Sequence, residues 1–113
     1  MQLNQREIPS RQIKFSAQEE GKEIGRAFLV LGYNDLRDQP FGLLEDVYVF
    51  EEARGRGVGG ELLQKVIATA KQEGCYKLIG TSRYSRPEVH EWYKRLGFED
   101  HGREFRLQFN DNG

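Results

Sequence analysis

A glycine-rich loop separates two stretches of the chain whose apolar residues recur at different intervals. Before the loop, the run 41–50 ends in four consecutive β-forming residues, Val47 to Phe50, which favours a mostly buried strand. After the loop, apolar residues recur at helical spacing: Leu62, Leu63, Val66, Ile67 and Ala70. We therefore expect a strand, a loop and a helix in direct succession, with Gly74 as the C-terminal cap of the helix.

Two strands are expected before this unit. Apolar and polar residues alternate around 13–17, and a polar turn then leads into the apolar run 24–33. Gly25 and Gly32 are the expected bulge positions in the second strand. The two strands and the turn between them predict a hairpin.

Three more elements are expected after the helix. Residues 76–81 predict a short buried strand, and Pro87 suits the first turn of a helix that Gly97 ends. Alternating apolar residues predict a final strand: Phe105, Leu107 and Phe109. The order β-β-β-α-β-α-β predicts an α/β fold with a central mixed β-sheet and helices packed on it. With 113 residues, a single domain over 1–113 is expected.

Composition limits the classes of partner. The chain has 17 Lys and Arg, 18 Asp and Glu, a formal net charge of -1 and no basic block, which argues against nucleic acid and anionic membranes. Its apolar runs are too short to span a bilayer. Cys75 is the only cysteine, which excludes an internal disulfide and a thiolate metal cluster. We therefore expect no metal and a cytoplasmic location.

The loop carries four glycines and two arginines in seven residues: Arg54, Gly55, Arg56, Gly57, Val58, Gly59 and Gly60. Between a strand and a helix, such a loop aims unpaired backbone N–H groups and the positive end of the helix dipole at one point. Glycines allow close approach and the arginines add charge, so a diphosphate is a suitable occupant. The alternative is a loop whose glycines only form a tight turn, which this glycine density makes less favoured.

Two other phosphate-binding patterns fit the loop less well. Gly55, Gly57 and Gly60 satisfy the dinucleotide pattern Gly-x-Gly-x-x-Gly, but residues 51–53 separate them from the strand, and the next strand ends at 80–82 without an acidic residue. The phosphate-loop pattern of nucleotide-hydrolysing enzymes requires Lys and then Ser or Thr after the glycines, whereas Glu and Leu follow here.

Three segments together resemble the signature of the GNAT superfamily of N-acetyltransferases: Leu44 to Val49, Arg54 to Gly59 and Trp92 to Phe98. Their order and spacing resemble the family as well, over roughly residues 24–109. The resemblance implies that the loop 54–60 holds the pyrophosphate of acetyl-coenzyme A (acetyl-CoA), the cosubstrate. It also implies that the strand 43–50 splays from the strand 76–81.

The resemblance assigns a role to the backbone of that splayed strand. The pantetheine arm of acetyl-CoA would lie between the two strands and bond to free backbone groups near Val47 and Val49. The amide of Val49 would also polarise the thioester carbonyl. At the start of the second helix, where the family often has an asparagine that contacts the cofactor, this chain has Ser85 and Arg86. One of these two is expected to replace that contact.

Tyr93 is the catalytic acid that the resemblance implies, because it lies four residues before Gly97-Phe98. A phenol with a pKa of about 10 can return a proton to a thiolate whose conjugate acid has a pKa of about 8.5. The structural alternative is a packing role, since apolar residues share the helical face of Tyr93.

Glu45 and Asp46 precede the loop and are candidates for removing a proton from the acceptor amine. Strand alternation places their side chains on opposite faces, so only one of them would face the acceptor. The structural alternative for each is a solvated charge at a sheet edge. Together with Asp35 and Asp38, they favour a cationic amine as the acceptor.

The part of the chain before the hairpin is short for a family whose members usually begin with a strand and one or two helices that wall the acceptor site. We therefore expect either a large acceptor or a second subunit that closes the site, and we favour a homodimer. The first functional hypothesis is an enzyme that transfers an acetyl group from acetyl-CoA to a primary amine by direct attack in a ternary complex. The alternative is a non-catalytic acyl-CoA-binding module or sensor.

Overall fold

The computed structural model of the chain describes residues 1–81 and 87–111. The chain divides into two compact units, Met1–Gly80 and Thr81–Gly113. The first unit contains four strands and the helix that follows the glycine loop, and the second contains one further helix. The single domain over 1–113 stays a prediction.

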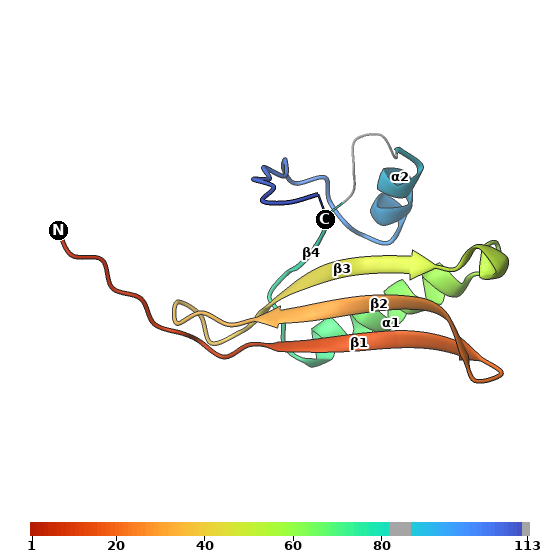
Figure 1. Cartoon of the computed structure of the whole chain (residues 1–113), viewed down its shortest axis with the longest axis horizontal. Helices are drawn as coiled ribbons and strands as arrows, with labels where there is room; N and C mark the ends of the chain where they lie inside the picture. The colour runs from red at the N-terminus through yellow and green to blue at the C-terminus, as the bar shows by residue number, and fades with distance from the viewer. Residues whose placement is uncertain (82–86, 112–113) are drawn as a thin grey trace. The chain divides into compact units, whose positions relative to one another are not determined.

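The first unit is built on a four-stranded sheet in the order β1-β2-β3-β4 (Figure 1). Its strands are β1 (Arg11–Glu19), β2 (Lys22–Gly32), β3 (Phe41–Val49) and β4 (Leu78–Gly80). The β1/β2 and β2/β3 pairs are antiparallel, whereas β3 and β4 are parallel. The predicted mixed sheet is therefore confirmed.

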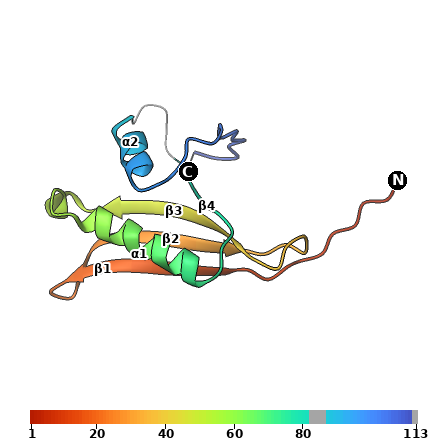
Figure 2. The same ribbon diagram turned by 180° about the vertical axis from the view of Figure 1, so that it is seen from behind.

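Helix α1 (Val58–Gln72) connects β3 to β4 and lies along one face of the sheet, behind it in Figure 1 and in front of it in Figure 2. Alternate residues of β2 face this helix and are completely buried: Ala27, Leu29 and Leu31. Four of the five apolar residues predicted to face the sheet are buried, as is Val58: Leu62, Leu63, Val66 and Ala70. The fifth, Ile67, is only partly buried. Since burial of one such leucine contributes roughly 1.5–3 kcal/mol, this layer fixes α1 on the sheet.

The first two strands form the predicted hairpin, with a two-residue turn. Glu20 (φ 52°) and Gly21 (φ 78°) both adopt the left-handed conformation, as a type I′ turn requires. The bulge in this pair lies at Ile24, beside Gly25, because the register shifts between Ala17 and Gln18 of β1.

Gly32 was wrongly expected to form a bulge. The pairing of β2 with β3 continues regularly through Gly32 and Phe41. The absence of a side chain has a different purpose here, because an added Cβ would lie 2.2 Å from Cζ of Phe41. Gly32 therefore makes room for the aromatic ring of the neighbouring strand.

Helix α1 ends at the predicted glycine. Gly74 has φ 80°, and the N–H of Cys75 donates to the carbonyl of Ala70 at 3.0 Å while the N–H of Gly74 donates to Lys71 at 3.0 Å. This pair of bonds is a Schellman motif, which satisfies carbonyl groups that the helix leaves unpaired.

Two strand predictions need correction. β4 covers only residues 78–80, and Ile79 is 39% exposed, so the expected buried strand over 76–81 is shorter and less buried. The expected final strand is wrong, because residues 105–109 form no strand and their apolar side chains are 78–89% exposed. Alternation supplies one apolar face, but a strand also needs a neighbour for its N–H and C=O groups. The described part of the second unit contains no strand to pair with.

Candidate functional site

The glycine loop has a backbone that only glycine adopts without strain. Gly55 (φ 80°) and Gly57 (φ 82°) are both left-handed, a conformation that costs other residues roughly 1–2 kcal/mol. No atom lies within 4 Å of the position of an added Cβ at either glycine. The loop therefore turns sharply and presents open backbone to its surroundings.

The loop leads into the first turn of α1, whose N–H groups lack intrahelical partners. Gly57 is the N-cap residue and supplies no side-chain hydrogen bond. The side chain of Val58 is buried, so Val58 can contribute only its backbone N–H. Together with the adjacent Gly59 and Gly60, these amides lie at the positive end of the helix dipole, which is the arrangement that an anion site requires.

Gly25 of β2 sets the close approach of this helix end to the sheet. An added Cβ at Gly25 would lie 3.0 Å from Cγ1 of Val58 and 3.2 Å from Cδ1 of Leu62. A larger residue at this position would push the first turn of α1 outward. Gly25 thus positions the loop, a role that the sequence analysis did not assign to it.

β4 covers only the first part of β3. Their pairing runs from Gly42 with Leu78 to Leu44 with Gly80, whereas β3 continues to Val49. The N–H of Phe50 donates to Ile24 of β2 at 3.0 Å, and because successive strand residues alternate in direction, the backbone groups of Val49 point to the opposite edge. Over residues 45–49, no described strand covers that edge. The predicted splay of the two strands stays a prediction, because β4 ends where its pairing with β3 ends.

The two arginines of the loop point to different parts of the first unit. Arg54 donates from Nε to the carbonyl oxygen of Val49 at 2.9 Å, and its guanidinium lies 5.4 Å from the centroid of the Tyr48 ring. Arg56 instead forms a two-pronged ion pair with Glu19 of β1. Sequence reasoning missed Glu19, because only the folded hairpin brings it to the loop.

Asp46 lies in a β-bulge of β3, and Glu45 is the residue before the bulge. The register shifts opposite Ala27 of β2, and Asp46 has φ 48°. Both side chains are exposed, and which of the two faces the acceptor stays a prediction. Asp46 forms an ion pair with Arg26 at 3.5 Å, whereas Glu45 has no ion-pair partner among the described residues.

Two further acidic residues were expected near the acceptor. Asp35 is already paired with Arg6, which reduces its contribution to a negative surface. Asp38 is exposed.

Tyr93 belongs to the second unit, in helix α2 (Pro87–Arg95). Gly97 (φ 101°) ends this helix as predicted, and the N–H of Phe98 donates to the carbonyl of Tyr93 at 3.0 Å. The rings of Tyr93 and Phe98 lie 5.2 Å apart between centroids, the apolar contact that accompanies a Schellman motif. The half-buried Tyr93 thus has a packing role; its catalytic role stays a prediction. Ser85 and Arg86 lie outside the described residues.

Cys75 has the environment of a packing residue. Burial, and secondarily the charge of Glu73, raise the pKa of its thiol. A raised pKa lowers the thiolate fraction at neutral pH, which is the opposite of an activated nucleophile.

The described residues contain no group of three His, Cys, Asp or Glu side chains that could hold a metal ion. No helix among them has the length and apolar character needed to cross a membrane.

Comparison with known proteins shows which family the chain belongs to. The family model described as "Acetyltransferase (GNAT) family" matches residues 2–98. This chain therefore belongs to the GNAT acetyltransferase family. Its mixed sheet agrees with the fold of the solved acetyltransferase structures it resembles.

Individual relatives agree with this assignment. The chain is 35% identical to the glucosamine 6-phosphate N-acetyltransferase of Trypanosoma brucei brucei over 82% of its own length and 62% of the relative's. It is 33% identical to the aminoglycoside N(6')-acetyltransferase type 1 of Stenotrophomonas maltophilia, over 72% of this chain and 55% of the relative. The crystal structure of a Trypanosoma brucei acetyltransferase superposes with a TM-score of 0.76 at 31% identity, over 87% of this chain and 69% of that one. The chain thus spans less than two thirds of these curated relatives.

Proposed function

We propose that this chain is an acetyl-CoA-dependent N-acetyltransferase that acetylates a primary amine. The observation that carries the proposal is the edge of β3 that no described strand covers over residues 45–49, together with the N-terminus of α1. An open strand edge suits the amide-rich pantetheine arm, and the helix end suits the diphosphate. Membership of the GNAT family supports the same cosubstrate.

The proposed binding residues divide between these two features. Val47 and Val49 bind the pantetheine arm through their backbone groups. The pyrophosphate is held by the loop and the first turn of α1: Arg54, Gly55, Arg56, Gly57, Val58, Gly59 and Gly60. The open space at Gly55 and Gly57 supports this assignment, because a phosphate can approach their backbone without meeting a side chain.

The proposed reaction is direct attack of the amine on the thioester. The amine nitrogen forms a bond to the carbonyl carbon, and the N–H of Val49 stabilises the negative charge that develops on the carbonyl oxygen. The carbon–sulfur bond then breaks, and Tyr93 donates its phenolic proton to the departing thiolate. The products are the N-acetylated amine and free coenzyme A.

Glu45 is the proposed acceptor of the amine's proton. An amine near pKa 10 arrives protonated at neutral pH and must lose a proton before it can attack. Glu45 is exposed beside the bulge and has no ion-pair partner among the described residues, whereas Asp46 is engaged by Arg26. These carboxylates also favour a cationic acceptor, a class to which aminoglycosides belong.

The proposal is tested first by binding and then by turnover. Saturation with acetyl-CoA at 100 times its dissociation constant adds about 2.7 kcal/mol to stability, so the unfolding temperature should rise by several degrees, with NAD and ATP as inactive controls. Mass spectrometry then follows acetylation across a panel of amines. A rise in unfolding temperature without acetylation of any amine would favour the alternative, a non-catalytic acyl-CoA-binding module. The absence of a rise would contradict both the enzyme and the binding module.

The homodimer is a separate proposal. Light scattering during chromatography measures the molar mass in solution and tests it.

A further inference from the structure

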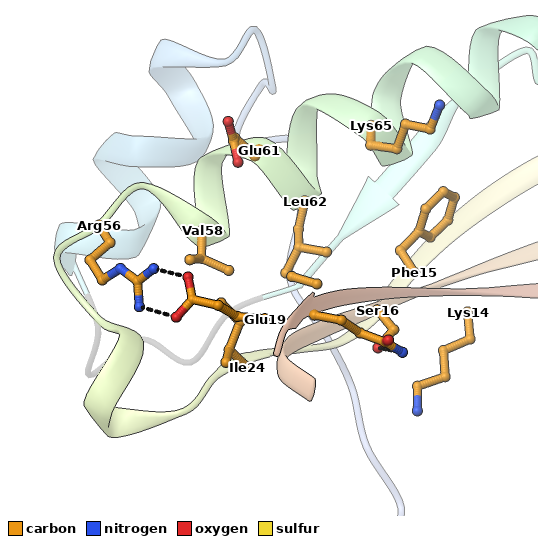
Figure 3. A pocket seen from close by; sticks show the side chains of 12 residues that line it. Lys14, Phe15, Ser16, Glu19, Ile24, Arg56, Val58, Glu61, Leu62 and Lys65 are labelled. Carbon is orange, nitrogen blue, oxygen red and sulfur yellow. Dashed lines mark hydrogen bonds and ion pairs between the residues drawn. The ribbon is translucent and has the colours of Figure 1, made fainter. Parts of the chain in front are cut away.

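The ion pair between Arg56 and Glu19 joins the glycine loop to the β1–β2 hairpin. Arg56 donates from Nη1 to Oε1 of Glu19 at 3.2 Å and from Nη2 to Oε2, so the carboxylate occupies two N–H donors of the guanidinium. Figure 3 shows both contacts. A phosphate binds arginine through the same kind of paired donors. Glu19 and a phosphate are therefore competitors for Arg56.

The hairpin holds Glu19 firmly in this position. Glu19 is the last residue of β1 and pairs with Lys22 across the two-residue turn. Two-residue turns of this type match the twist of the flanking strands and fix their register. Glu19 therefore depends on the hairpin for its place, whereas Arg56 belongs to an open loop.

The pair keeps Arg56 on the β1 side of α1. It borders a cleft of about 630 Å³ between β1 and the first turns of α1, lined in part by Ile24, Val58 and Leu62 (Figure 3). The open edge of β3 lies on the other side of β2. Arg54 is directed to that open edge and Arg56 to the cleft, so only one of the two arginines lies at the edge of β3.

We propose that Glu19 lowers the affinity for acetyl-CoA by withholding Arg56 from the diphosphate. Binding then requires Arg56 to exchange the carboxylate of Glu19 for a phosphate. The exchange is feasible because both side chains are about half exposed, at 48% and 50%, and exposed ion pairs contribute little stability. This inference rests on the proposed acetyl-CoA site.

The competition operates throughout the neutral pH range. The Arg56 guanidinium, through its hydrogen bonds and charge, lowers the pKa of Glu19. Glu19 is therefore ionised wherever the enzyme is assayed near neutrality.

The test is the dissociation constant of acetyl-CoA, measured by calorimetry on the full chain carrying Glu19→Gln. Release of Arg56 should lower this constant by about two- to fivefold, the range expected for one exposed ion pair. S-Acetylpantetheine, which lacks the diphosphate, should bind the variant and the wild type equally. The matched control is Glu23→Gln, which removes the same charge from the same hairpin but leaves Arg56 paired, since Glu23 binds Lys14 at 3.0 Å.

A double-mutant cycle separates the proposed role from a structural one. Arg56→Gln should weaken acetyl-CoA binding, and Glu19→Gln should then have no further effect. If Glu19 only supported the fold, its replacement would lower the unfolding temperature and weaken binding together. Should Glu19→Gln fail to fold, Glu19→Asp is the second variant. It keeps the charge, but its shorter side chain cannot hold Arg56 as well, so it should also lower the dissociation constant of acetyl-CoA.

An unchanged or raised dissociation constant in Glu19→Gln would overturn this inference. Failure of the wild type to bind acetyl-CoA would instead contradict the proposed function. The two failures are thus distinguished by the wild-type measurement alone.

Discussion

The side chain of Arg54 is hydrogen-bonded to the backbone of Val49, with 2.9 Å between Nε and the carbonyl oxygen. This bond ties the first residue of the glycine loop to the unpaired edge of β3. The guanidinium also lies over the Tyr48 ring, so two contacts fix its orientation. The positions of the loop and of the strand edge are therefore coupled through one side chain.

Replacement of Arg54 should weaken acetyl-CoA binding. Arg54→Gln removes the charge and the bond to Val49, and we expect the dissociation constant to rise about tenfold, which corresponds to ~1.4 kcal/mol. Arg37→Gln is the matched control, because Arg37 also lies over a tyrosine ring, that of Tyr76 at 4.4 Å, but away from the loop. Equal effects of the two substitutions on binding would contradict the role of Arg54.

Alanine should have opposite effects at two glycines of the loop. Gly57 has φ 82°, so Gly57→Ala should lower the free energy of unfolding by about 1–2 kcal/mol. Gly60 lies inside α1 with open space around its Cα, so Gly60→Ala should raise this free energy by about 0.5–1 kcal/mol. Urea denaturation measures both values. A stabilising Gly57→Ala would show that the loop does not require the left-handed conformation.

Loss of the Tyr93 hydroxyl should affect turnover more than binding. Tyr93→Phe keeps the ring that packs on Phe98, so α2 should keep its end while kcat falls about 100-fold. The affinity for acetyl-CoA should stay unchanged, and Tyr76→Phe serves as the control for loss of a phenol elsewhere. Full activity of Tyr93→Phe would leave Tyr93 with its packing role alone.

Glu45 and Asp46 should differ in their effects on the reaction. Glu45→Gln should lower kcat about 100-fold because the amine loses its proton acceptor. Asp46→Asn removes the ion pair with Arg26 but preserves the left-handed backbone, which asparagine tolerates. It should therefore cost no more than about 1 kcal/mol of stability. Steady-state kinetics measures kcat, and urea denaturation measures the free energy of unfolding. A larger loss of kcat in Asp46→Asn than in Glu45→Gln would assign the proton transfer to Asp46.

Cys75 should react slowly with alkylating reagents in the folded protein. Because burial raises the pKa of its thiol, the thiolate fraction near pH 7.5 is smaller than in an unfolded chain. Alkylation by iodoacetamide should therefore accelerate in urea. A folded-state rate equal to that of a small-molecule thiol would contradict this expectation.

The sequence by itself determined the elements that depend on local patterns. The change of apolar spacing at the loop placed α1 from Val58, and glycines at 74 and 97 ended both helices, because left-handed caps are a local requirement of the backbone. The resemblance of three segments, in order and spacing, to the GNAT signature also identified the family. These features depend on neighbours in the chain, and the sequence contains them directly.

The tertiary structure decided what depends on distant partners. The strand pattern at 105–109 was not sufficient for a strand, because backbone hydrogen bonds need a neighbour that no local pattern supplies. The bulge at Asp46 arises from the pairing of β3 with β2, because Asp46 and Val47 both lie opposite Ala27. The contact of Glu19 with Arg56 joins residues 37 positions apart, and only folding of the hairpin beside α1 brings their opposite charges together.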